Sequence, residues 1–136
     1  MAFVENNQFK ALAAFRYELR KFLKFSEEAA KAQGVTPQQY QALLAIEGFS
    51  GRGEISVGEL AEQLQIVSHS AVGLVDRMEK RKLIKRNVSK QDKRFVSIGV
   101  TPLGRSLLEK VAAIHRRELR TAGPLLMDLL EKVERL

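Results

Sequence analysis

The residues of this chain best suited to bind a charged partner gather in one short segment. From Arg77 to Arg94 there are nine basic and two acidic residues, so the segment carries a net charge of +7. The whole chain also has a formal net charge of +7, so the remaining 118 residues sum to zero. A positive patch this concentrated is typical of a surface that binds a polyanion. A solvated surface without a partner is the alternative, because basic runs are common. An anionic membrane fits less well, since the segment has few apolar residues.

The sequence offers little for enzymatic chemistry. It contains no cysteine, which excludes disulfides, thiolate metal sites and cysteine nucleophiles. Its two histidines, His69 and His115, fall on separate predicted helices, and His115 is expected to be exposed beside two arginines. Glycine-rich phosphate loops, paired zinc ligands and a Gly-x-Ser-x-Gly motif are all missing. We therefore expect no catalytic residue, no metal and no cofactor.

Length and composition fit one small globular protein. The chain has 136 residues, 45% hydrophobic and 29% charged, which suits a single domain with or without dimerisation arms. No apolar run approaches the ~18 residues of a membrane-spanning helix. The first residues do not form a basic stretch followed by an apolar block, so no secretory signal is expected. The cytoplasm is the default location.

Capping signals and apolar spacing predict a series of helices. Thr36 with Gln39, and Ser56 with Glu59, match the capping-box pattern, and Ser68 is a further candidate cap. The predicted helices cover residues 8–32, 36–48, 56–64, 68–81, 103–121 and 125–136, with the last two separated by Gly123-Pro124. The pair at 56–64 and 68–81 has the spacing of a helix-turn-helix.

A two-stranded hairpin is predicted directly after this helix pair. Residues 83–87 and 95–100 read as strands around a polar, basic loop. Asp92 and Arg94 are two residues apart, so in extended backbone their side chains point the same way. An ion pair between them would orient the arginine at the hairpin tip. A helix-turn-helix followed by such a hairpin is a winged helix.

Three stretches in this region resemble the MarR family of winged helix-turn-helix regulators. They are Val57–Leu64, Leu74–Arg81, and Asp92-Lys93-Arg94 followed seven residues later by Thr101-Pro102-Leu103-Gly104. The resemblance implies a mainly α fold with a small β-hairpin wing. It implies a DNA-binding lobe over residues 36–102, with the helix-turn-helix at about 56–81 and the wing at about 83–100. N-terminal (1–35) and C-terminal (103–136) dimerisation helices would flank this lobe.

The same resemblance implies a homodimer that binds roughly palindromic duplex DNA and regulates transcription, more often as a repressor. A helix would enter the major groove, and Arg94, oriented by Asp92, would reach the minor groove. The expected DNA-binding residues are Ser56, Ser68, His69, Ser70, Gly73, Arg77, Lys85, Lys90, Lys93 and Arg94. The expected dimerisation residues are Leu12, Phe15, Leu19, Leu125, Leu126, Leu129, Leu130 and Val133.

Two positions depart from the family pattern. Lys82 stands where a glycine usually precedes the first wing strand, which predicts a different helix end. Gly73 stands where a longer polar side chain often faces the groove, so His69 and Ser70 become the better candidates for base contacts. Lys80, Arg81 and Lys85 are expected to neutralise phosphates.

A small aromatic effector is a further expectation that the resemblance implies. Arg16, Arg20, Phe22 and Tyr40 are the candidate residues, although ordinary packing explains each of them as well. The alternative function is a winged-helix module that binds protein or RNA without operator specificity, because winged folds serve several purposes.

Overall fold

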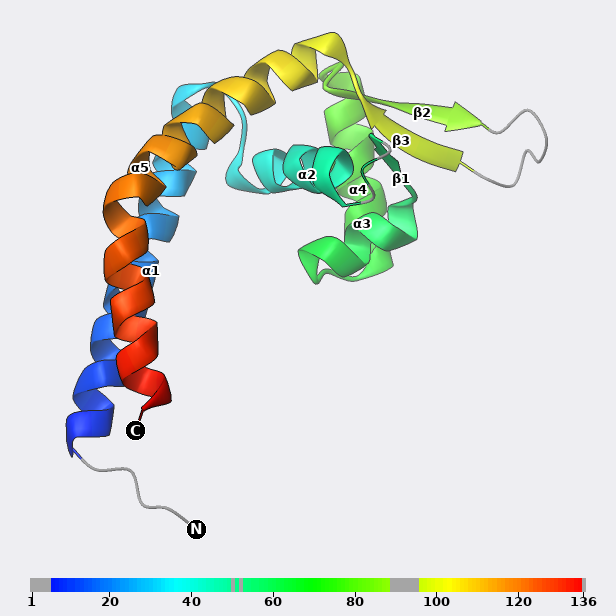
Figure 1. Ribbon diagram of the computed structural model, residues 1–136. Coiled ribbons are helices and arrows are strands. Elements are labelled where there is room, and N and C mark those ends of the chain that lie inside the picture. Colours follow the sequence, from blue (N-terminus) through cyan, green and yellow to red (C-terminus); the bar gives the residue numbers. More distant parts are fainter. Residues whose placement is uncertain (1–5, 50, 52, 89–95, 136) are drawn as a thin grey trace. The chain divides into compact units, whose positions relative to one another are not determined.

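The structure is a computed structural model that describes residues 6–49, 51, 53–88 and 96–135. The chain divides into two compact units. The first, here called the helical unit, comprises Met1–Ala29 and Ala112–Leu136, and the second, the winged-helix unit, comprises Ala30–Val111. Along the chain the elements are α1 (Asn6–Ala32), α2 (Pro37–Gly48), β1 (Glu54–Ile55), α3 (Val57–Leu64), α4 (Ser68–Lys80), β2 (Ile84–Val88), β3 (Val96–Val100) and α5 (Pro102–Glu134) (Figure 1).

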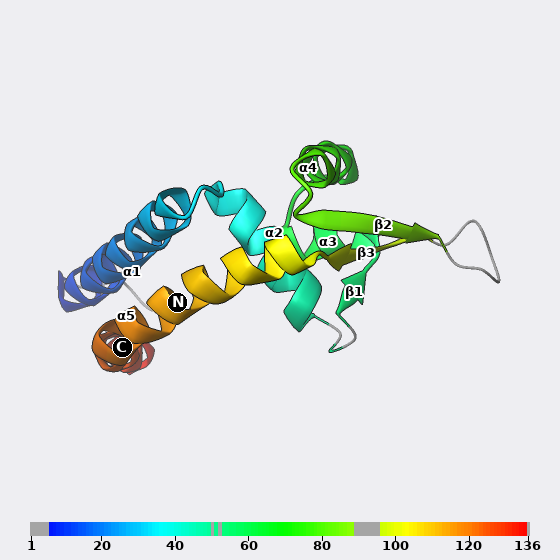
Figure 2. The same ribbon diagram turned by 90° about the horizontal axis from the view of Figure 1, so that it is seen from above.

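In the helical unit, α1 and the later part of α5 lie side by side and run in opposite directions (Figures 1 and 2). Residues three or four apart line the half-buried side of each helix, including Phe15, Leu19 and Phe22 on α1, and Leu126 and Leu129 on α5. This spacing keeps one apolar stripe per helix facing its neighbour. None of the described helices combines the length and the apolarity needed to cross a membrane.

The predicted break at Gly123-Pro124 is wrong. Helix α5 runs without interruption from Pro102 to Glu134 with Pro124 inside it. A proline in a helix interior removes a backbone hydrogen bond and costs roughly 3 kcal/mol. Ala122, Leu126 and Leu129 nevertheless continue the half-buried stripe in helical register across the proline. The helix therefore continues in register across the proline in spite of the local signal that ends helices.

The predicted exposure of His115 is also wrong, because its side chain is buried. Its ring centroid lies 6.1 Å from that of Phe22 and 6.5 Å from that of Phe25. His115 follows the buried Val111 by four residues and so shares its face of α5, whereas Arg116 and Arg117 point to solvent. The prediction followed the two charged neighbours in the sequence and overlooked that His115 lies on the buried side of the helix.

The winged-helix unit contains a three-stranded antiparallel sheet in the order β1-β3-β2. The sequence predicted only the hairpin of β2 and β3. Strand β1 has two residues, paired as Glu54↔Gly99 and Ile55↔Ile98, which is too short to show an alternating pattern. The core beneath the sheet is formed by fully buried side chains from α2, α3, α4 and all three strands: Leu43, Ile46, Ile55, Leu60, Leu74, Met78, Ile84 and Ile98.

Both predicted capping boxes are confirmed. The Thr36 hydroxyl accepts a hydrogen bond from Gln39 N at 3.0 Å, and Gln39 Oε1 accepts one from Thr36 N at 3.2 Å. Ser56 and Glu59 form the same pair of bonds at 3.1 and 3.0 Å. Ser68 is not a cap: it is the first residue of α4, and Val67 occupies the capping position without a side-chain hydrogen bond.

Candidate nucleic-acid interface

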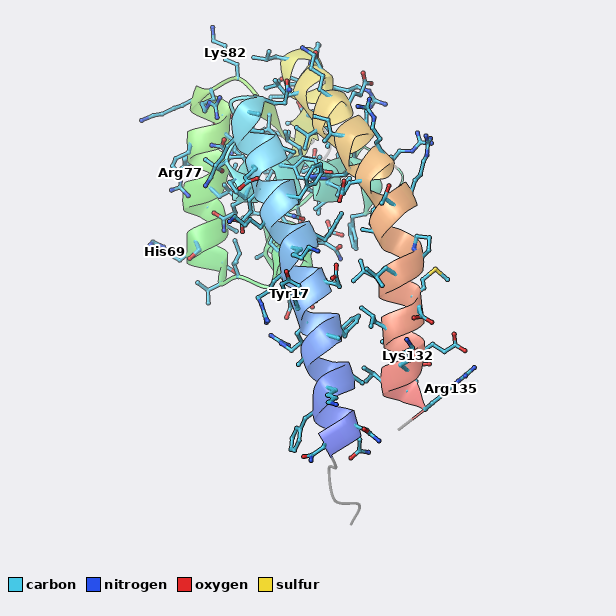
Figure 3. The ribbon with its side chains drawn as sticks, turned by 90° about the vertical axis from the view of Figure 1, so that its left-hand side faces the viewer. Tyr17, His69, Arg77, Lys82, Lys132 and Arg135 are labelled. Carbon is cyan, nitrogen blue, oxygen red and sulfur yellow. The ribbon has the colours of Figure 1, made fainter. Side chains whose placement is uncertain are left out.

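Helix α4 presents a polar side to solvent opposite its buried face. Ala71, Leu74, Val75 and Met78 are buried, as predicted from their spacing. The opposite side begins with three exposed residues in the first turn, Ser68, His69 and Ser70, and continues through half-buried Gly73 to exposed Arg77. His69 and Arg77 project from the same side of α4 (Figure 3). A helix with such a side can enter a major groove, which has the width of an α-helix.

The remaining predicted DNA-binding residues fall in different surroundings. Lys85 is exposed on β2. Ser56 is half-buried, and its hydroxyl oxygen already accepts the capping bond from Glu59 N. Lys90, Asp92, Lys93 and Arg94 lie outside the described residues. The register of β2 and β3 ends at the pair Val88↔Val96, and these four residues belong to the segment that joins the two strands.

Arg86 is a basic residue of the positive segment whose role the sequence did not reveal. Its guanidinium donates from Nη2 to Asp76 Oδ1 and from Nη1 to Glu79 Oε1, both at 2.7 Å. Its backbone N–H donates to Glu79 Oε2 at 3.1 Å. The hydrogen bond with Asp76 is the largest cause that raises the pKa of Arg86, and desolvation opposes it. These bonds tie β2 to α4 and leave Arg86 with little net charge for a polyanion.

Arg81, which the sequence predicted to neutralise phosphate, donates hydrogen bonds to two acceptors of the protein. Its guanidinium donates from Nη1 to Gln39 Oε1 at 2.6 Å and from Nη2 to the Gly34 carbonyl at 2.5 Å. The Gln39 amide oxygen also accepts from Thr36 N, so Arg81 joins the end of α4 to the start of α2. Arg81 therefore uses two of its donors to hold these helix ends together, and we place it outside the proposed phosphate contacts.

Three lysines in the described part of this segment are exposed. Lys80, Lys82 and Lys85 have no carboxylate partner among the residues that the structure describes. Together with Arg77 they surround the end of α4 and the start of β2. The positive patch is thus smaller than the count of basic residues in the sequence suggests. It remains at the end of α4 and the start of β2.

The departure at Lys82 has a clear structural consequence. Lys82 adopts a left-handed backbone conformation with φ +62°, which is unusual for a residue with a side chain. Its N–H donates to the Glu79 carbonyl at 2.9 Å, and the Leu83 N–H donates to the Met78 carbonyl at 3.0 Å. This is the Schellman pattern that glycine usually completes. The helix end is therefore the ordinary one, built with a strained residue.

The departure at Gly73 leaves room on the exposed side of α4. A Cβ atom added at Gly73 would lie 3.2 Å from Nη1 of Arg77. The Arg77 guanidinium therefore extends back along the helix over a position that lacks a side chain. Because this group ends a flexible chain, it can move aside when a partner approaches.

The Thr101–Gly104 motif positions the wing relative to α5. The Thr101 hydroxyl accepts from Gly104 N at 3.1 Å and donates to the Lys82 carbonyl at 2.6 Å. Thr101 N donates to the Leu83 carbonyl at 3.0 Å. Thr101 therefore caps α5 and also hydrogen-bonds the backbone carbonyls of Lys82 and Leu83, between α4 and β2.

The candidate effector residues are divided between the two units. Arg16 and Arg20 are exposed on α1, and Phe22 is half-buried in a concavity of the helical unit together with Glu18, Lys21 and Glu118. Lys21 pairs with Glu18 at 3.4 Å, so this concavity retains acidic character. Tyr40 belongs to the winged-helix unit, where it is buried in the core and desolvation raises its pKa.

Comparison with known proteins gives consistent results. Residues 33–94 match the model of the MarR family. The chain is 30% identical over 86 residues to the transcriptional repressor MdtR of Bacillus subtilis, covering 63% of this chain and 54% of MdtR. The chain spans between half and two thirds of the length of MdtR and of a second Bacillus subtilis regulator, YsmB.

Solved structures share the fold. A mutant of MepR from S. aureus bound to an oligodeoxyribonucleotide is 25% identical with a TM-score of 0.68, covering 79% of this chain and 77% of the other. AbsC, a MarR family regulator from Streptomyces coelicolor, is 21% identical with a TM-score of 0.79, covering 100% of this chain and 93% of AbsC.

Proposed function

We propose that this winged-helix chain is a member of the MarR family and that it regulates transcription as a homodimer that binds duplex DNA. The observation that carries the proposal is the side of α4 that bears His69, Gly73 and Arg77, bordered by exposed lysines that have no carboxylate partner in the described part of the chain. The helix supplies groove contacts, and the lysines neutralise phosphates on either side of it. MdtR is named a repressor, and we propose repression here as well.

The wing is the second part of the proposed contact. The strands β2 and β3 lead to the segment with Lys90, Lys93 and Arg94, and Asp92 is proposed to orient Arg94. An arginine in a narrow minor groove favours A·T-rich sequence through the shape of the groove. The helix would thus read base edges, and the wing would add a preference for the flanking sequence.

The proposed dimer rests on apolar side chains of the helical unit. Leu12, Leu125 and Leu130 are each more than 40% exposed, and Phe15, Leu19, Leu126, Leu129 and Val133 are half-buried. Burying apolar area contributes about 25 cal/mol per Å². A second copy that covers these residues would bring two α4 helices onto one duplex, with half-sites about one helical turn apart.

Release by a small effector is a weaker part of the proposal. Arg16 and Arg20 could receive a carboxylate at the surface of α1. The concavity at Phe22 carries Glu18 and Glu118, so it disfavours an aromatic acid and suits a neutral or cationic compound better. Titration of the protein–DNA complex with compounds of each charge tests this point.

Fluorescence anisotropy tests the central proposal. The protein is titrated into labelled duplex from the promoter region next to its own gene, with scrambled duplex and RNA of equal length as controls. We expect preferential binding to the promoter duplex, and a loss of about a thousandfold or more in affinity between roughly 50 and 200 mM salt. Equal affinity for all three nucleic acids would favour the alternative, a module without operator specificity. A monomer in sedimentation would exclude the homodimer.

A further inference from the structure

The two carboxylates that bind Arg86 are not equivalent. Glu79 uses both oxygens: Oε1 accepts from the guanidinium at 2.7 Å, and Oε2 accepts from the Arg86 backbone N–H at 3.1 Å. Asp76 uses only Oδ1, which accepts from Nη2 at 2.7 Å. Its side chain is 56% exposed, and no donor within the described residues reaches Oδ2. Glu79 therefore anchors Arg86, while Oδ2 of Asp76 has no donor among the residues that the structure describes.

Asp76 lies on the exposed side of α4 that the proposed function places in the major groove. It is three residues after Gly73, and positions three apart are neighbours on a helix surface. Because Gly73 has no side chain, a partner can approach the helix closely beside Asp76. Among the described residues, the atom that a Cβ at Gly73 would meet is Nη1 of the flexible Arg77 guanidinium.

A carboxylate on a surface that faces a polyanion is unfavourable unless a cation offsets it. Arg86 supplies that cation at 2.7 Å, and Arg77 and Lys80 are neighbours along α4. The pairing reduces repulsion from phosphates and also fixes the direction of the Asp76 side chain. A carboxylate retained and oriented in this way is suited to accept a hydrogen bond from the partner.

Only two groups in the major groove donate hydrogen bonds: the N4 amino group of cytosine and the N6 amino group of adenine. In adenine the N7 acceptor lies beside the donor and repels a carboxylate. Cytosine presents its N4 donor beside a C–H group, and it pairs with acidic side chains. The donor that suits Asp76 is therefore cytosine.

We propose that Asp76 is a specificity-determining residue that accepts a hydrogen bond from a cytosine N4 group in each half-site, and that Arg86, anchored by Glu79, is its positioning residue. The inference rests on the proposed function, since it requires α4 in the major groove. It adds one base preference at one position of each half-site. Asp76 contributes this preference at the expense of some non-specific affinity, because it brings negative charge toward the phosphates.

Selection from a pool of random duplexes tests the inference, with the wild-type protein and the Asp76→Asn, Asp76→Ala and Glu79→Gln variants in parallel. The wild type should enrich a C·G pair at one position of each half-site by about tenfold over the other pairs. Asp76→Asn should shift the preference at that position to adenine, because an amide pairs with N6 and N7. Asp76→Ala should lose the preference there and keep it at all other positions.

Glu79→Gln tests the positioning role of Arg86, since it changes the carboxylate that anchors this arginine. It should weaken the cytosine preference, because Arg86 then holds the Asp76 side chain less firmly, and leave the preferences at all other positions unchanged. Identical selected sites for the wild type and both Asp76 variants would overturn the inference and leave the proposed function intact. If the wild type itself enriches no duplex, the proposed function fails first. Circular dichroism and the thermal midpoint confirm that each variant is folded.

Discussion

The backbone carbonyl of Leu83 occupies the space that any side chain at residue 104 would need. A Cβ atom built on Gly104 would lie 2.1 Å from that oxygen and 2.9 Å from Cγ1 of Val100. The first turn of α5 therefore packs directly on the backbone that joins α4 to β2. Thr101 donates hydrogen bonds to the carbonyls of Lys82 and Leu83. Both ends of the Thr101–Gly104 motif therefore contact the same stretch of backbone.

Gly104→Ala should destabilise the protein, because the backbone at Leu83 cannot move aside as a side chain can. We expect a loss at the upper end of the roughly 1–3 kcal/mol that overpacking costs, measured as a lower free energy of unfolding in urea. Gly58→Ala on α3 is the matched control: a Cβ there would meet only Ser56 Oγ at 4.0 Å. That variant should be neutral or slightly more stable. Equal stability of the two variants would contradict the close approach at Leu83.

Lys82→Gly should stabilise the protein. Lys82 has φ +62°, and the left-handed region costs residues with a Cβ roughly 1–2 kcal/mol that glycine avoids. Glycine loses more backbone entropy on folding, so we expect a net gain of about 0.5–1 kcal/mol in the free energy of unfolding. Lys82→Ala removes the same charge but keeps the Cβ atom, and should give no such gain. A similar gain in both variants would attribute the effect to charge and not to the backbone.

Tyr40 should make the protein sensitive to alkali. Burial raises the pKa of Tyr40 above its usual value of 10.0. Its contribution to stability is fully present below pH 10, where folded and unfolded chains both hold the proton. It is lost above pH 10, because the unfolded chain releases the proton first. The slope is at most 1.36 kcal/mol per pH unit.

Thermal midpoints of the wild type and Tyr40→Phe between pH 8 and 11.5 measure this contribution. The variant should lose part of the alkaline decline, whatever its stability at pH 8. Tyr17→Phe removes an exposed phenol and should follow the wild-type curve. Parallel curves for the wild type and Tyr40→Phe would show that the buried phenol does not carry the pH dependence.

The sequence predicted the helices, both capping boxes and the β2–β3 hairpin because each depends on local spacing. It missed β1, since two residues cannot show an alternating pattern. It ended α5 at Pro124 because the local signal for a break is strong, whereas the helix continues through the proline. The apolar spacing on both sides of Pro124 was visible in the sequence, but spacing alone does not show that two stretches belong to one helix.

The sequence predicted the site from residue types, without showing which group each side chain binds. The count of basic residues treated Arg77, Arg81 and Arg86 alike. In the structure Arg81 binds Gln39 and Gly34, and Arg86 binds two carboxylates of α4. Such contacts link residues 7 to 47 positions apart, and no spacing rule reveals them. Only the structure separates arginines that hold the fold from those that can meet DNA.

Arg77→Ala and Arg81→Ala should therefore act on different properties. Arg77 extends from the exposed side of α4, so its loss should weaken binding to promoter duplex by about tenfold or more and leave the thermal midpoint unchanged. Arg81→Ala removes the hydrogen bonds to the Gln39 side chain and the Gly34 carbonyl. It should lower the free energy of unfolding by about 1–3 kcal/mol, because hydrogen bonds to charged groups are stronger than average. Its slope of log affinity against log salt should match that of the wild type, since no phosphate contact is lost, whereas Arg77→Ala should reduce that slope by about one. If Arg81→Ala reduces the slope and Arg77→Ala does not, the assignment of the two arginines is reversed.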